Sequence, residues 1–160
     1  MRHRIASVSI HHTSPLAVSA DIAAERHKAI SDLIFENSFQ LKSPAAAHGP
    51  YVLSLALYAD WLDMQVDCQH STHREELKLS LPPFRPLMRD YGIICDNFQK
   101  TAQSGQLYKL EAIDMGRRAV HNEAAELLIE SLENKVILDK LTARRLFSLL
   151  YVLHIRNLNL

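Results

Sequence analysis

An apolar stretch near the end of the chain constrains the fold more than any other feature. Residues 146–155 are apolar on nearly every side of the helix that their length and composition indicate. The stretch is about half of the ~20 residues that a membrane-spanning helix needs, so we expect a buried helix and not a membrane anchor. Such a helix must be covered on several sides. It should lie at the centre of a helical layer with an antiparallel sheet on one side, or contribute half of its surface to a subunit interface.

The segment between residues 51 and 81 predicts that sheet. Apolar and polar side chains alternate over residues 51–58 and 62–68, which is typical of a β-hairpin, and again over residues 76–81, which predicts a third strand. Residues 4–11 alternate in the same way and predict a short N-terminal strand. The meander strands should share one apolar face, with Asp63, Gln65 and Lys78 among the side chains on the other.

Helical patterns flank the sheet on both sides in the sequence. They cover about residues 20–36, 83–103, 106–134 and 140–155, with a short extended link at residues 136–138. Ser19 or Asp21 can cap the first helix, and Asp139 or Thr142 the last. The sequence therefore predicts a single α+β domain over residues 1–160, in which a small, mainly antiparallel sheet packs against about four helices.

The net charge and the cysteine content limit which partners and which cellular compartment the sequence favours. Eighteen basic and eighteen acidic side chains cancel, which disfavours a nucleic acid partner drawn in by long-range attraction. Cys68 and Cys95 are too few for a disulfide framework or a four-ligand zinc site, which suits a reducing cytoplasm. The first thirty residues lack the apolar middle of a secretory signal. We expect a cytoplasmic protein that makes no membrane contact.

Polar and charged groups are most concentrated in residues 111–123. At a hundred degrees per residue, Asp114, Arg118 and His121 fall on one side of a helix, and apolar side chains fall on the other. One face can pack while the other is available for a ligand. The candidate ligand-binding residues are Asp114, Arg117, Arg118, His121, Asn122 and Glu123.

Two conformations of this helix remain open from the sequence. A straight helix over residues 106–134 would be ~40 Å long and would hold an ion pair between Asp114 and Arg118 that contributes ~0.3–0.5 kcal/mol. A break at Gly116 would instead place two arginines at a new helix amino end, which is a natural anion site. His121 lies ~10 Å from Asp114 along the axis, so a catalytic dyad would need another partner. A hydrogen bond that ties helices together is the commoner role of such a histidine.

Other chemistry-bearing residues have structural explanations that are favoured. Cys68, His70 and His73 gather in a polar turn, but no second pair completes a metal site, so no metal or cofactor is predicted. Arginine pairs at residues 85 and 89 and at residues 144 and 145 could bind phosphate. Bridges to carboxylates inside the chain are the favoured alternative.

Short residue groups spread along the chain resemble a known family. They are Glu25-Arg26, Ala29-Ile30, Glu36-Asn37-Ser38-Phe39, Gly49-Pro50-Tyr51, Pro83-Phe84-Arg85, Asp90-Tyr91, Ile94-Cys95, residues 111–118, His121-Asn122-Glu123, Ala143-Arg144-Arg145-Leu146-Phe147 and Leu153-His154. Together they resemble an uncharacterised alphaproteobacterial protein family, number 0262 of the uncharacterised-protein-family series, from about residue 4 to residue 156. The resemblance implies a bacterial cytoplasmic protein of similar fold, and it implies no reaction, cofactor or partner.

Two functional hypotheses follow from the sequence. The leading one is a non-catalytic binding or regulatory protein that self-associates, for example as a homodimer. The terminal helix, apolar on all sides, favours self-association, and the lack of a complete set of catalytic residues favours a non-catalytic role. The alternative is an enzyme or ligand-binding protein for an anionic small molecule, which the arginines of residues 111–123 would hold while His121 or Glu123 moves a proton.

Overall fold

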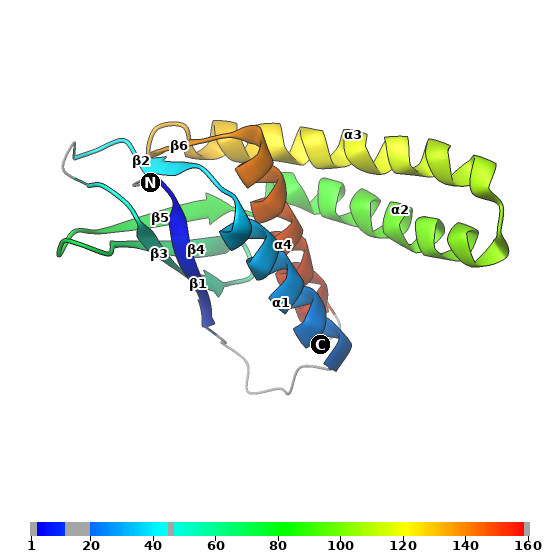
Figure 1. Cartoon of the computed structure of the whole chain (residues 1–160), viewed down its shortest axis with the longest axis horizontal. Coiled ribbons are helices and arrows are strands. Elements are labelled where there is room, and N and C mark those ends of the chain that lie inside the picture. The colour runs from blue at the N-terminus through cyan, green and yellow to red at the C-terminus, as the bar shows by residue number, and fades with distance from the viewer. Residues whose placement is uncertain (1–2, 12–19, 45–46, 159–160) are drawn as a thin grey trace.

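A sheet and four helices form most of the structure, a computed structural model that describes residues 3–11, 20–44 and 47–158. The elements in chain order are β1 (Ile5–His11), α1 (Ala20–Phe35), β2 (Phe39–Leu41), β3 (Tyr51–Leu57), β4 (Trp61–Cys68), β5 (Arg74–Ser80), the short 3-10 helix η1 (Pro82–Phe84), α2 (Arg85–Ser104), α3 (Leu107–Leu132), β6 (Val136–Leu138) and α4 (Lys140–Leu158). Figure 1 shows the sheet at one end of the molecule and the helices beside and beyond it.

The main sheet has the order β1-β3-β4-β5. β3, β4 and β5 form the antiparallel meander that the period-two pattern predicts, and β1 joins the edge of β3 as a parallel strand. The parallel direction follows from the connection between β1 and β3, which contains α1 and returns the chain to the same end of the sheet. The predicted α+β class and the mainly antiparallel sheet are confirmed.

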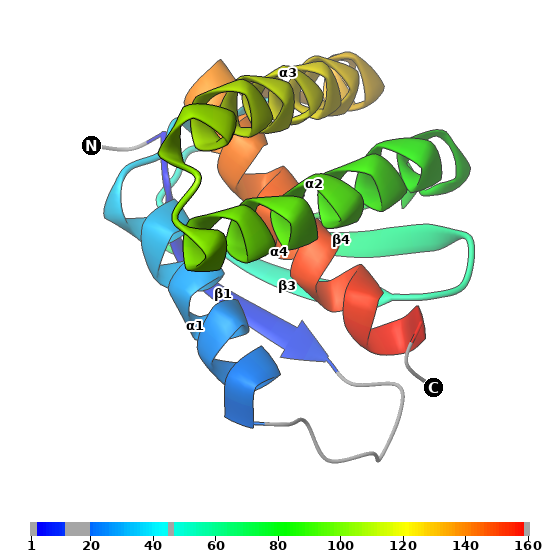
Figure 2. The same cartoon turned by 90° about the vertical axis from the view of Figure 1, so that its right-hand side faces the viewer.

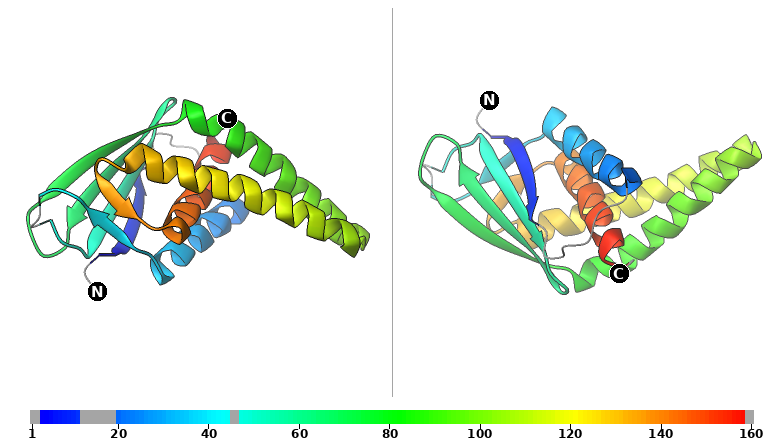
Figure 3. Two further views of the ribbon diagram at one scale, coloured as in Figure 1. Left: turned by 90° about the horizontal axis from the view of Figure 1, so that it is seen from above. Right: turned by 90° about the horizontal axis from the view of Figure 1, so that it is seen from below.

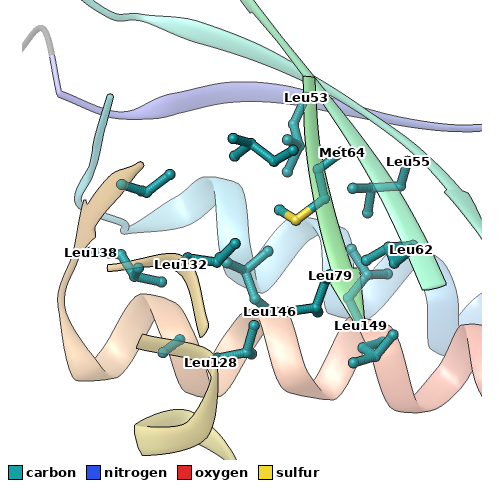
Figure 4. Packing of buried hydrophobic residues seen from close by; sticks show 14 of the residues in the cluster. Leu53, Leu55, Leu62, Met64, Leu79, Leu128, Leu132, Leu138, Leu146 and Leu149 are labelled. Carbon is teal, nitrogen blue, oxygen red and sulfur yellow. The ribbon is translucent and has the colours of Figure 1, made fainter. Parts of the chain in front are cut away.

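The terminal apolar helix lies at the centre of the molecule. The side chains of Phe147, Leu149 and Leu150 in α4 are almost fully buried. α4 packs against α1 and α3, and its leucines meet leucines and a methionine of the sheet (Figure 4). The first of the two arrangements expected for residues 146–155 is therefore confirmed, since the chain covers these described side chains itself.

Several local expectations are confirmed, and one short strand had no sequence signal. The Asp139 carboxylate accepts a hydrogen bond of 2.8 Å from the Thr142 N–H and caps α4. The extended link at residues 136–138 is β6, which pairs with β2 in a second small sheet. β2 is only three residues long, too short for an alternating pattern to stand out. Of the two expected caps of α1, Ser19 lies outside the described residues.

The third strand begins earlier than predicted. β5 starts at Arg74, whose side chain forms an ion pair of 2.6 Å with Asp67 on the neighbouring strand. This contact extends the pairing of β4 with β5 beyond the apolar alternation that marks residues 76–81. The pairing of β4 with β5 is therefore lengthened by opposite charges on the two strands, beyond the part that apolar side chains mark.

Asn37 joins β1 to the end of α1. Its carboxamide oxygen accepts a 2.7 Å hydrogen bond from the Ile5 N–H, and its NH₂ group donates to the carbonyl oxygens of Ile5, at 3.0 Å, and Leu33, at 2.9 Å. β1 is an edge strand, so these bonds satisfy backbone groups that have no strand partner on that side. One side chain thus fixes the edge of the sheet to the helical layer.

The hairpin of α2 and α3 extends away from the rest of the molecule (Figure 1), and Figure 2 shows it from the side of its tip. Gly105 ends α2 with φ +76°, a left-handed conformation that glycine adopts without strain and that reverses the chain into α3. Met88 in α2 and Ala124 in α3 are buried, but no residue between them is. Only the base of the hairpin belongs to the core.

Replacing Asn37 should destabilise the fold without changing its shape. Asn37→Ala removes three hydrogen bonds and leaves the Ile5 N–H without its acceptor, so the free energy of unfolding should fall by about 2–3 kcal/mol. Urea denaturation followed by circular dichroism measures it. Asn97→Ala, the same change at an exposed position of α2, should alter the free energy of unfolding by less than about 0.5 kcal/mol. Equal effects of the two substitutions would contradict this role of Asn37.

Candidate functional site

The polar face of α3 begins with a three-residue ion cluster. Asp114 binds Arg117 one turn on, and its second carboxylate oxygen lies 2.9 Å from Arg118. The Arg117 guanidinium also lies over the Phe98 ring of α2, 4.6 Å from its centre. The predicted ion pair between Asp114 and Arg118 is confirmed, and one carboxylate offsets part of the charge of two arginines.

α3 continues through Gly116 without a break. Arg117 and Arg118 therefore lie in the middle of a helix and not at an amino end, so the anion site that a break would create does not form. A methyl group at Gly116 would meet no atom within 4 Å, so no close packing inside the chain requires glycine there. Of the two conformations left open by the sequence, the straight one is confirmed.

His121 points into the junction of α3 with α4. Its Nε2 lies 2.7 Å from the carbonyl oxygen of Arg144, and this short contact favours the tautomer in which the Nε2–H donates. The hydroxyl of Ser148 lies 3.0 Å from the same nitrogen and donates to the same carbonyl at 3.2 Å. No described hydrogen bond or ion pair joins His121 to Asp114. The structure thus gives His121 a role in tying two helices together.

Three aromatic rings continue this junction into α2. Tyr91 stacks on Tyr151 at 4.9 Å between ring centres and on Phe147 at 5.5 Å, and it lies 5.4 Å from His121. A methyl group at Gly92 would come within 2.9 Å of the Tyr151 hydroxyl, so glycine there lets α2 approach α4. No sequence pattern predicts this ring cluster, because its residues read as ordinary helix or as part of the apolar stretch.

The titratable groups of the junction are uncharged near neutral pH. Burial lowers the pKa of His121 below its ordinary value, and the charges of Arg144 and Arg117 add to this effect. Burial also raises the pKa of the Tyr91 hydroxyl and of the Cys95 thiol, and raises the pKa of Tyr151 to about 12. A neutral imidazole beside protonated phenols and a protonated thiol is suited to packing and hydrogen bonding, since none of these groups is an activated nucleophile.

The six predicted site residues do not gather at one point. Asp114 and the two arginines form the ion cluster, while His121 turns toward α4. Asn122 is half-buried and Glu123 is exposed. The polar face of α3 is divided between an ion cluster on the extended hairpin and a hydrogen-bonded junction at its base.

A second polar surface lies on the outer face of the main sheet. A hollow of about 460 Å³ is lined there by side chains of β1, β3, β4 and β5, among them Ser54, Gln65 and Glu76. Tyr58 stacks on Trp61, and the Lys78 ammonium lies over the Trp61 ring at 4.6 Å. The charges in this hollow have mixed sign, so they do not select one ligand class.

One arginine of each remaining predicted pair, Arg85 and Arg145, has partners inside the chain. Arg85 donates to the carbonyl oxygen of Ala59 at 2.6 Å and pairs with Asp60 at 2.8 Å, and Arg145 donates to the carbonyl oxygen of Glu36 at 2.6 Å. Within the described residues, no group of three His, Cys, Asp or Glu side chains is arranged to hold a metal ion. None of the described helices is both long enough and apolar enough to cross a bilayer.

The comparison with protein families decides which family this is. The model of an uncharacterised protein family, UPF0262, matches residues 2–156. The chain belongs to UPF0262. The resemblance identified from the sequence is therefore confirmed.

Bacterial UPF0262 proteins are similar to the chain over almost their whole length. A UPF0262 protein of Erythrobacter litoralis is 46% identical to this chain, and the match covers 97% of this chain and 98% of the relative. One of Caulobacter vibrioides is 43% identical, with 96% and 94% covered, and one of Cereibacter sphaeroides is 42% identical, with 95% and 98% covered. No solved structure matches the chain. The names of these UPF0262 relatives state no activity.

The junction predicts a specific dependence of stability on pH. Because the pKa of His121 is lower in the folded protein than in the unfolded chain, the unfolded chain takes up a proton more readily as the pH falls through about 6.5. The free energy of unfolding should therefore decrease as the pH falls from 7.5 to 5.5. His121→Gln, which keeps a donor for the Arg144 carbonyl, should show a smaller decrease in urea denaturation at the two pH values.

An exposed histidine provides the control for this experiment. His27→Gln on α1 should leave the decrease unchanged. Part of the decrease should survive in His121→Gln, since burial also lowers the pKa of His154. A decrease that His121→Gln leaves at its full size would contradict the burial of a neutral imidazole in the junction.

Proposed function

We propose that the protein is a non-catalytic binding or regulatory module that self-associates through the α2–α3 hairpin. The observation that supports this proposal most is the absence of any buried residue between Met88 and Ala124, although the segment contains many apolar side chains. Ile93, Leu107, Tyr108 and Met115 are all more than half exposed. A long helical hairpin of this kind has apolar surface that its own chain leaves in water.

Helix packing explains why the hairpin alone cannot cover this surface. In an antiparallel pair each helix buries the stripe that faces the other, and here the half-buried Ile94 and Phe98 of α2 and Ile113 and Val120 of α3 occupy those stripes. Any apolar side chain outside the stripes needs a third partner. Fully burying one large apolar side chain contributes roughly 1.5–3 kcal/mol, so a partner that covers several of them has a sufficient driving force.

The reason for self-association differs from the one that the sequence suggested. The sequence pointed to the terminal apolar helix, but α4 packs inside the chain between the sheet, α1 and α3. The exposed apolar surface is concentrated on the hairpin instead. The proposal of a homodimer therefore rests on α2 and α3.

A non-catalytic role is supported by the state of the titratable groups. The junction of Tyr91, Cys95, His121 and Tyr151 contains no activated base or thiol. Asp114 binds both arginines of the predicted anion site. These arrangements use the polar groups of α3 to position helices, which is what a binding module requires of them.

Binding of an anionic small molecule to the polar face of α3 is the alternative, and one feature favours it. The Arg118 side chain is 69% exposed and can reach an anion in solution. A thermal-shift screen of phosphates, nucleotides and carboxylates addresses it, because a ligand at a hundred times its dissociation constant stabilises by about 2.7 kcal/mol. A shift that disappears in Arg118→Ala would favour this alternative over the binding module.

We place the protein in the bacterial cytoplasm. Cys68 is buried, Cys95 is half-buried, and both are free thiols. Proteins in reducing compartments keep thiols in this form. The bacterial relatives are consistent with this placement.

Light scattering coupled to size exclusion tests the self-association. The wild-type protein should pass from about 18 kDa toward twice that mass as its concentration rises. Tyr108→Glu combined with Met115→Glu introduces four charges into each dimer and should keep the protein monomeric. Phe35→Glu, at an apolar side chain that is 84% exposed but lies on α1, should still dimerise.

Two results would overturn the proposal. A wild-type protein that stays monomeric at millimolar concentration would remove self-association. Dimerisation that survives in the double variant but disappears in Phe35→Glu would move the interface away from the hairpin.

A further inference from the structure

We propose that two copies of the chain pair through one stripe of α3, antiparallel about a two-fold axis, and this inference rests on the self-association proposed above. The α3 stripe consists of Tyr108, Ala112, Met115 and Ala119. All four residues are exposed, Tyr108 by 76% and Met115 by 66%. Their spacing of four, three and four residues is that of a helix–helix seam.

The α3 stripe lies on the free side of the hairpin. The half-buried side chains of α3 that face α2 are at Leu110, Ile113, Arg117 and Val120. At 100° per residue, the α3 stripe is centred roughly 150° around the helix from them. Figure 3, left, shows α3 lying in front of the other elements along its length. A second helix can therefore approach without displacing any described element.

The order of large and small residues favours an antiparallel pair. When α3 meets a second α3 in the opposite direction, Tyr108 faces the partner's Ala119 and Met115 faces the partner's Ala112. Two-fold symmetry repeats both contacts, so every layer joins a large side chain to a small one, which lets the layers interdigitate. A parallel pair would place tyrosine against tyrosine and alanine against alanine.

Charges beside the α3 stripe match the same arrangement. Glu111 and Arg118 lie on one flank of the stripe, roughly 20° apart around the helix. In the antiparallel pair Glu111 is next to the partner's Arg118, twice by symmetry, as flanking charges are in antiparallel helix pairs. Arg118 is 69% exposed and already lies 2.9 Å from Asp114, so its guanidinium can serve a second carboxylate.

The size of the seam indicates a dimer that depends on concentration. Two large and two small side chains from each copy cover less than the ~800 Å² per partner of a stable interface. The dimer should form and separate as the local concentration of the protein changes. A regulatory role follows from this reversibility, because the hairpin is free in one state and covered in the other.

Charge reversal combined with sedimentation equilibrium tests the pairing. Glu111→Arg should raise the dimer dissociation constant roughly tenfold, because two attractions become repulsions, and Arg118→Glu should do the same. Glu111→Arg with Arg118→Glu in one chain should bring the constant back to within about threefold of the wild type. Glu123→Arg, a matched charge change on the same helix, should not rescue Arg118→Glu.

A packing exchange tests the same seam without changing a charge. Ala112→Met should weaken the dimer roughly tenfold, because two methionines then meet in each central layer. Ala112→Met with Met115→Ala keeps one large and one small side chain per layer and should restore the dimer. Circular dichroism of each variant confirms that the monomer is folded.

The outcomes separate this inference from the proposed function. Rescue in both exchanges supports the antiparallel seam. Dimerisation through the hairpin with no rescue in either exchange overturns the seam and leaves the proposed self-association standing. Rescue of Arg118→Glu by Glu123→Arg overturns the antiparallel direction, since those two positions meet only in a parallel pair.

Discussion

Covering α4 on all sides is the constraint on which the rest of the structure depends. Its apolar side chains are buried by the sheet, by α1 and by the base of α3. Together with the Tyr91 ring near the start of α2, which stacks on Phe147 and Tyr151, they are enough to cover it, so only the first part of α2 and the last part of α3 enter the core. The remainder of both helices extends away from the rest of the molecule, so its apolar surface stays exposed and can bind a partner. The internal core and the exposed hairpin are thus consequences of one packing requirement.

Polar side chains hold these layers in register. Asn37 connects the edge strand to α1, the Thr142 hydroxyl accepts a 2.8 Å hydrogen bond from the Ser38 N–H, and His121 connects α3 to α4. The bonds of Asn37 and Thr142 satisfy backbone groups that regular secondary structure leaves unpaired, so removing either bond would leave such a group without a partner. His121 instead contacts a carbonyl oxygen inside α4 and joins the two helices there. The residue groups that identify the family include Asn37 and His121. In this structure those residues hold elements together.

The sequence predicted the fold better than the use of its polar residues. Alternation in β3 and β4, the Asp139 cap and the pair of Asp114 with Arg118 are local, so a period or a spacing is enough to predict them. Whether a helix face meets water or its own chain depends on elements far away in the sequence. The helical period puts His121 on the polar side of α3, and a hydrogen bond between helices is its favoured role, but no local pattern indicates that Tyr91 and Phe147 cover it. Tyr108 and Met115 lie on the side that stays exposed, which no local pattern distinguishes from a packed side.

Hydrogen exchange measured at increasing protein concentration tests the central claim most directly. If the outer part of the hairpin is completed by a second copy, amide protection over residues 107–120 should rise with concentration, while protection in α4 should stay constant because its own chain already covers it. Protection over residues 107–120 that is the same at micromolar and millimolar concentration would contradict the account.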